Sequence, residues 1–186
     1  LESDAAEAEK RVACRELAQI GTSSAVPVLA ALLSDERLSH LARAALQQIP
    51  GAACDAALRS ALQQLGGEPL AGVIHTVGER GDSHAVPALV ARLNSETATL
   101  AQASAAALGR IGTAAAAQGL QHALPSVAGM TQLAVCEGLL ECAAAFEADG
   151  KHAAAASIYA ALQAQPELSA GTRAAVRRAV ILIRGQ

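Results

Sequence analysis

The sequence contains almost no aromatic residues. One Phe, one Tyr and no Trp occur among 186 residues. Proteins that hold single-stranded nucleic acid stack the bases on aromatic rings, and binding to nucleic acid in general relies on a surplus of basic residues. The net charge of -3 and the pI near 5.9 provide no such surplus. We therefore expect no nucleic-acid partner.

Long hydrophobic runs and targeting signals are also missing. No apolar run reaches the roughly 18 residues that a membrane-spanning helix requires, so we predict no membrane span. The acidic start, Leu1 to Asp4, lacks the basic region of a secretory signal. Because the chain does not begin with Met, we expect a segment of a longer polypeptide or a mature form. A cytoplasmic location is favoured, and an exported mature segment stays open.

Motifs that carry catalysis or bind metal are not found in the sequence. There is no Walker loop, no Cys-x-x-Cys and no pair of histidines four residues apart. Glu137 and Glu141 lie one helical turn apart, where they could share a metal or a basic partner, but a solvated helix face is the favoured interpretation. We predict no enzyme activity and no cofactor. Four cysteines are predicted to be small buried hydrophobes: Cys14, Cys54, Cys136 and Cys142.

A helix ending recurs along the chain at a nearly constant step. The sequence Ala-Leu-Gly-Arg-Ile-Gly at 107–112 returns as Leu-Ala-Gln-Ile-Gly at 17–21, as Ala-Leu-Gln-Gln-Ile-Pro at 45–50 and, more weakly, as Thr-Val-Gly-Glu-Arg-Gly at 76–81. The closing residues 21, 50, 81 and 112 are 29, 31 and 31 residues apart. Such a period is the signature of stacked helical repeats.

Helical spacing of apolar residues and local stop signals predict an all-α chain with one leading helix and about five helix pairs. Gly21 is expected to end the first helix in the left-handed region. Thr22 to Ser24, Asp35, Asp82 and Asn94 are expected at helix starts. The expected helices cover about residues 4–20, 25–33, 35–49, 52–65, 69–80, 85–93, 94–111, 114–124, 130–148, 151–164 and 170–184. A very apolar stretch, residues 180–183, suggests that the last helix covers another domain or repeat.

These repeats resemble HEAT repeats, in the short bacterial form also seen in phycobilisome-lyase-like proteins. Residues 85–112 match the pattern best, residues 22–50 match apart from Pro50, and residues 51–81 are degenerate. The resemblance implies a right-handed α-α superhelix, an armadillo-like solenoid. We expect residues 1–186 to form a single solenoid segment, with regular repeats over about 4–125 and divergent repeats over about 126–186. Within the divergent part, residues 150–162 look partly like a tetratricopeptide helix.

The resemblance also implies that the second helix of each pair lines a concave face. Aligning the helix endings stacks polar side chains of mixed charge in columns on these helices. Such a mixed surface suits a protein or peptide partner better than a nucleic acid, although the same residues would also suit a merely solvated face. The candidate binding residues are Arg11, Arg15, His40, His75, Glu79, Gln102 and Arg110.

The favoured function is a non-enzymatic interaction or scaffold module that holds a protein partner or neighbouring domains of the same polypeptide. The alternative is a bilin-lyase-like enzyme or lyase subunit, for which Tyr159 and Phe146 offer few aromatic contacts to a tetrapyrrole. A third class, helical-repeat DNA glycosylases, is disfavoured by the absence of Trp and by the negative charge balance.

Overall fold

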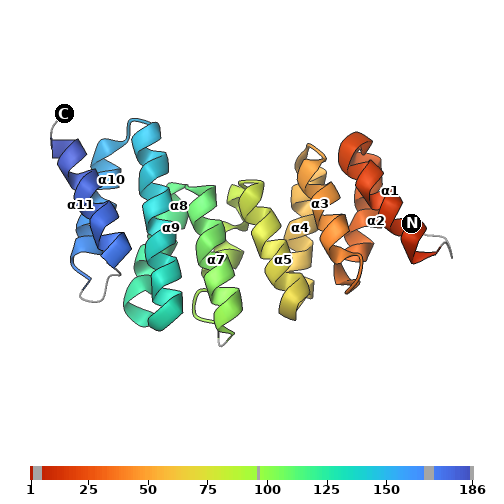
Figure 1. The fold of residues 1–186 in the computed structure, drawn as a ribbon, viewed down its shortest axis with the longest axis horizontal. Coiled ribbons are helices and arrows are strands. Elements are labelled where there is room, and N and C mark those ends of the chain that lie inside the picture. The colour runs from red at the N-terminus through yellow and green to blue at the C-terminus, as the bar shows by residue number, and fades with distance from the viewer. Residues whose placement is uncertain (2–5, 96, 166–169, 185–186) are drawn as a thin grey trace. The chain divides into compact units, whose positions relative to one another are not determined.

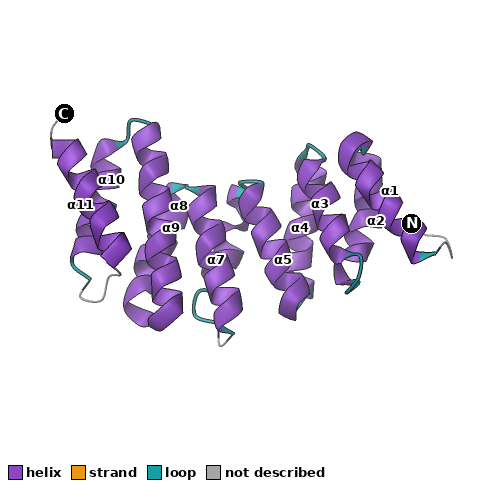
Figure 2. Ribbon diagram, in the orientation of Figure 1, coloured by secondary structure: helices purple, strands orange, loops and turns teal. Residues whose placement is uncertain are grey.

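All secondary structure in the described part of the chain is helical (Figures 1 and 2). The structure is a computed structural model that describes residues 1, 6–95, 97–165 and 170–184. The all-α prediction is confirmed. The α-helices are α1 (Glu7–Ile20), α2 (Val26–Ala31), α3 (Ser39–Gln48), α4 (Ala52–Gln64), α5 (Gly67–Glu79), α6 (Val86–Val90), α7 (Ala98–Ile111), α8 (Ala114–Ala123), α9 (Gly129–Ala148), α10 (His152–Gln163) and α11 (Ala170–Arg184).

The chain divides into two compact units, residues 1–82 and 83–186. In the first unit, α1 packs on α3 and α3 on α5, while α2 and α4 pack together behind them. In the second unit, α7 packs on α9, and α8 and α10 also pack against α9. Every expected pair, from α2 with α3 to α10 with α11, is in contact. Whether residues 1–186 form one solenoid stays a prediction.

Each unit has a core of aliphatic side chains and alanines. Residues such as Leu29, Leu46 and Leu62 in the first unit, and Leu108 and Leu139 in the second, are fully buried. Burial of one such side chain contributes roughly 1.5–3 kcal/mol.

Two expectations lie outside the described residues: the helix start at Asp4, and the side chains of the apolar stretch at 181–183.

The expected helix starts and stops were only partly correct. Gly21 has φ -64°, so its backbone is not left-handed. Glycine is needed there for space, because a Cβ would lie 2.3 Å from the Leu17 carbonyl oxygen and 2.8 Å from Ile49 Cδ1. Gly81 and Gly112, by contrast, have φ of 65° and 62° and do occupy the left-handed region.

The expected caps at residues 22–24 and at Asp35 have different outcomes. The hydroxyls of Thr22 and Ser24 are 2.8 Å apart and hydrogen-bond to each other. Asp35 accepts hydrogen bonds from the backbone of Arg37 and Leu38, so it caps a turn and α3 begins only at Ser39. Asp35 thus satisfies backbone donors in the tight turn before α3, as short polar side chains readily do.

Asp82 and Asn94 likewise bind side chains. The Asp82 carboxylate pairs with Arg59 at 2.5 Å. The Asn94 side chain accepts from the Ser126 hydroxyl at 3.1 Å, and α7 begins at Ala98. The N-cap of α7 is Thr97, so the expected cap at Asn94 was wrong.

Arg80 ties two helix pairs of the first unit together. It stands where the recurring ending has Ile20, Ile49 and Ile111, and its side chain is only 10% exposed. Its guanidinium donates to the carbonyl oxygens of Leu46, Gln47, Ile49 and Gly51 at 2.7 to 3.2 Å. It also pairs with Asp55 in the first turn of α4 at 2.5 Å.

The ending of α3 explains why an arginine is needed there. Pro50 stands in place of the terminal glycine and has no N–H to offer. A glycine ending satisfies the last carbonyls of a helix through backbone N–H groups. At α3 the Arg80 side chain supplies donors instead, and its positive charge lies at the negative end of the helix dipole.

In the second unit, glycines let α7 and α9 approach closely. A Cβ on Gly138 would lie 2.6 Å from the Ala105 carbonyl oxygen, and one on Gly109 would lie 2.7 Å from the Gly138 Cα. The Cys142 thiol faces the carbonyl oxygens of Leu108 and Gly109 at 3.8 and 3.9 Å. The contact is therefore formed by backbone and very small groups.

We expect Arg80→Ala to lower the free energy of unfolding by about 2–4 kcal/mol, because four carbonyls and the Asp55 carboxylate lose their donor. Arg80→Ile restores the residue of the other endings but should be equally destabilising, since Ile also lacks donors. Urea denaturation measures both. The control is Arg15→Ala on the exposed surface of α1, expected within about 0.5 kcal/mol of the parent. If Arg80→Ile matched the parent, the capping role would be wrong.

Gly138→Ala should destabilise the protein by about 1–3 kcal/mol through the clash with the α7 backbone. This loss would occur although alanine is intrinsically the better helix former by about 1 kcal/mol. Thermal unfolding of this variant beside Glu137→Ala, a change at the exposed neighbour, tests the contact. A gain in stability for Gly138→Ala would show that the two helices can separate at little cost.

Candidate functional site

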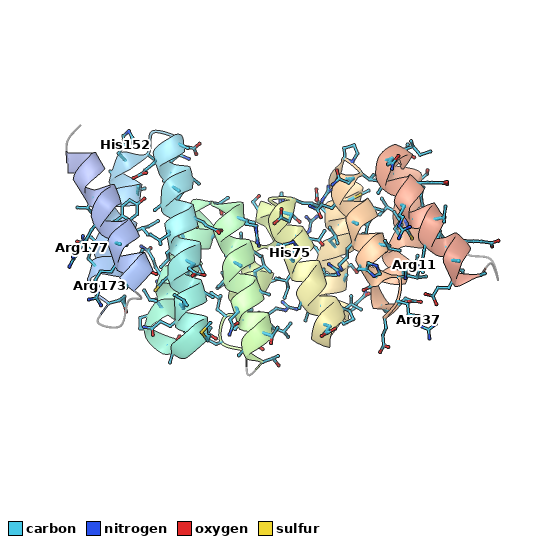
Figure 3. The ribbon with its side chains drawn as sticks, in the orientation of Figure 1. Arg11, Arg37, His75, His152, Arg173 and Arg177 are labelled. Carbon is cyan, nitrogen blue, oxygen red and sulfur yellow. The ribbon has the colours of Figure 1, made fainter. Side chains whose placement is uncertain are left out.

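The predicted binding residues lie on the layers formed by the second helices of the pairs. In the first unit, Arg11 and Arg15 are on α1, His40 is on α3, and His75 and Glu79 are on α5. Four of these are exposed and Arg11 is half-buried. Figure 3 shows Arg11 and His75 on α1 and α5. In the second unit, α7 carries Gln102, which is half-buried, and Arg110, which is exposed.

Some of the predicted residues form local pairs. Arg11 lies 3.7 Å from Glu7, whose carboxylate also pairs with Arg37 at 2.8 Å. His75 and Glu79 lie 3.9 Å apart on successive turns of α5. Exposed pairs of this kind contribute about 0–1 kcal/mol, so they order the surface slightly without fixing the fold. The first unit thus presents side chains of both charges.

Two clefts flank the turn that precedes α3. One, of about 460 Å³, lies between the start of α1 and the turn and is lined by Glu7, Lys10, Asp35, Glu36, Arg37 and Leu38. The other, of about 630 Å³, lies between the turn, α3 and the start of α5. It is called the α3–α5 cleft below, and its lining residues are Glu36, Ser39, His40, Arg43, Glu68 and Pro69.

The α3–α5 cleft contains one predicted residue, His40, and one that sequence reasoning missed, Arg43. Nη1 of Arg43 donates to the Gly72 carbonyl oxygen at 3.1 Å. The buried Nε atom has no hydrogen-bond partner. Burial lowers the pKa of Arg43, and the Arg43 guanidinium pairs with no carboxylate among the described residues.

The repeat register contains a signal that would have found Arg43. Counting back seven residues from each helix ending gives Cys14, Arg43, Ile74 and Ala105. The other three members of this column are fully buried. A charged residue at a core position therefore marks the cleft, and the same comparison at the endings marks Arg80.

The second unit also contains the two glutamates and the two aromatic residues that the sequence analysis considered. The Glu141 carboxylate lies against Gly109, 2.5 Å from where a Cβ would stand, and both Glu141 and Glu137 are exposed. In the described residues no group of three or more His, Cys, Asp or Glu side chains is placed to hold a metal ion. Phe146 and Tyr159 are 6% and 4% exposed, so both rings belong to the core.

Comparison with known proteins identifies a fold and no family. No family model matches the sequence, and no curated protein matches it. The chain is similar to a solved crystal structure described as that of an engineered protein, with a TM-score of 0.55 and 19% identity. The match covers 98% of this chain and 93% of the other. Such a likeness shows the fold alone. Across the described ranges, no helix is both long and apolar enough to cross a membrane.

The four cysteines are buried, as predicted. Burial raises the pKa of each thiol, to about 12 for Cys142. A raised pKa lowers the thiolate fraction at pH 8, and the thiolate is the reactive form. We therefore expect the native protein to react very slowly with Ellman's reagent at pH 8, and all four thiols to react after denaturation in guanidinium. Rapid reaction of one thiol in the native protein would contradict this assignment.

Proposed function

We propose that the chain is a HEAT-like solenoid segment that acts as a non-enzymatic protein-interaction or scaffold module. Four of its helix endings recur at steps of 29 to 31 residues, and each pair packs against its neighbours within a unit. The resemblance of the endings to HEAT repeats and the all-helical fold support this proposal. The partner is a protein or a peptide, or a neighbouring domain of the same polypeptide.

One observation carries the choice of surface. The layer formed by α1, α3 and α5 presents exposed Arg15, His40 and His75. It also borders two clefts of several hundred cubic ångströms, one of which His40 lines. Non-obligate protein interfaces are mixed surfaces with polar rims, and arginine is enriched in them. The Arg80 network holds α3, α4 and α5 in register, and a rigid surface loses less entropy on binding.

The bilin-lyase alternative draws no support from the aromatic residues. A large flat chromophore is usually held by apolar and aromatic side chains around a concave site. Phe146 and Tyr159 are occupied within the second unit, where Lys151 also lies 5.9 Å from the centre of the Phe146 ring. We therefore propose the interaction module in preference to the lyase.

A comparative pull-down from native lysate tests the proposal. The parent chain is compared with a variant in which Arg11, Arg15, His40 and His75 are replaced by Ala. We expect the parent to retain a partner and the variant to lose it at least tenfold, because removal of several interface side chains costs about 1 kcal/mol or more at each important position.

The control replaces Ser60, Gln63 and Gln64 by Ala. These residues are exposed on α4, in the other layer of the first unit. The control variant should retain as much partner as the parent. If the parent retains nothing above background, the interaction module is wrong. If the control loses the partner while the α1–α3–α5 variant keeps it, the binding surface lies on the other layer.

A further inference from the structure

The geometry points to the α3–α5 cleft as the site that receives the carboxylate of an Asp or Glu side chain of the protein partner, with Arg43 as the residue that binds it. This inference rests on the proposed function, since it names the chemistry of the partner at that surface. Four observations carry it: the position of Arg43 in the repeat register, the space made for it by Gly72, its lack of a counterion, and the acidic rim of the cleft.

The first observation is that Arg43 occupies a position at which the repeats otherwise have a buried core residue. Its equivalents Cys14, Ile74 and Ala105 are each 0% exposed. An apolar residue at position 43 would satisfy the packing rule that the other repeats obey. Departures from such a local rule concentrate at functional sites, so the substitution of a charge for a core residue calls for a specific reason.

The second observation is that α5 is adapted to Arg43. Gly72 stands where the preceding repeats have Val12 and Leu41, nine residues before the helix ending. A Cβ at Gly72 would lie 2.4 Å from Cζ of Arg43 and 2.7 Å from its Nε. The missing side chain therefore creates the space in which the guanidinium lies against the backbone of α5. The position of Arg43 therefore depends on the glycine at residue 72.

The third observation is the absence of a counterion within the described residues. Arg80, the other arginine at an apolar position, has the Asp55 carboxylate and four carbonyls as partners. Arg43 has one carbonyl, and its buried Nε has no acceptor. Arg43 is half-buried, and partial removal of a cation from water without an anion is unfavourable. A ligand carboxylate in the cleft would supply the missing charge, and arginine binds carboxylates strongly through charge-assisted hydrogen bonds.

The fourth observation explains which anions would enter. Glu36 and Glu68 line the same cleft and are exposed. The two carboxylates at the rim repel a polyanion, such as a nucleic acid or polyphosphate. They repel a ligand with a single carboxylate in an otherwise neutral or basic segment less strongly. His40 and the buried Ser39 also line the cleft and offer further donors. The cleft thus favours an isolated acidic residue of a peptide.

The test uses NMR titration of the full chain labelled with ¹⁵N. The probes are the acetylated and amidated pentapeptide Ala-Ala-Glu-Ala-Ala and its counterpart with Gln in the centre. We expect the Glu peptide to shift the Arg43 Nε–H signal and the backbone amides of residues 36–43, Gly67, Glu68 and Leu70 in a saturable way. The Gln peptide at equal concentration should not. Equal responses to the two peptides would overturn the inference.

Three variants assign the effect to the position of the guanidinium. Arg43→Gln removes the charge and should weaken binding of the Glu peptide at least about tenfold. Gly72→Ala keeps the charge but displaces the guanidinium, and it should weaken binding similarly. Lys151→Gln removes an exposed positive charge that lines neither cleft and should leave binding unchanged. If Lys151→Gln weakened binding as much as Arg43→Gln, general electrostatic attraction would replace the specific site. Should Arg43→Gln fail to fold, Gly72→Ala and the peptide pair still decide.

Tripolyphosphate serves as the polyanion probe. It should bind the parent chain more weakly than the Glu peptide does. In the double variant Glu36→Gln, Glu68→Gln the difference in affinity between the two probes should be smaller. Tighter binding of tripolyphosphate to the parent would overturn the assignment to an isolated carboxylate. The proposed function and this inference can fail independently. If the parent retains a partner in the pull-down but responds equally to the Glu and Gln peptides, the interaction module stands and only this inference is overturned.

Discussion

The whole architecture depends on one constraint: a helix of a few turns with a single apolar stripe cannot bury that stripe by itself. Isolated helices of this length are marginal in water, so each one is stable only against its neighbours. In the second unit the neighbours approach until Gly138 meets the Ala105 carbonyl. Small side chains make that approach possible, and the polar residues are left on the outward surfaces.

The sequence predicts those features that have local causes. The expected helices at 52–65 and 130–148 agree with α4 and α9 to within one residue at each end, because stop signals beside them act on the adjacent backbone. The caps were harder to predict. Asp82 and Asn94 have the right chemistry for a helix start, yet each is engaged by a side chain distant in sequence. Local propensity cannot reveal such competition.

The candidate site was predicted only in part for the same reason. Helical periodicity predicts that polar residues such as His75 are exposed, and they do lie on the surface. The clefts depend on the turn at 35–38 and on how α3 meets α5, which no short sequence window contains. Comparing repeats position by position recovers part of this information. Arg43 and Arg80 both break apolar columns, and the structure gives them different surroundings: Arg80 is surrounded by acceptors, and Arg43 lines a cleft.

The distribution of aromatic residues has a consequence for spectroscopy. The single Tyr of the chain, Tyr159, is buried in the unit formed by residues 83–186, and the chain has no Trp. Intrinsic fluorescence therefore reports on that unit alone, while the unit formed by residues 1–82 has no such chromophore and contributes only to the far-ultraviolet dichroism of its helices. Comparing the two signals during unfolding would show directly whether the two units melt as one cooperative body.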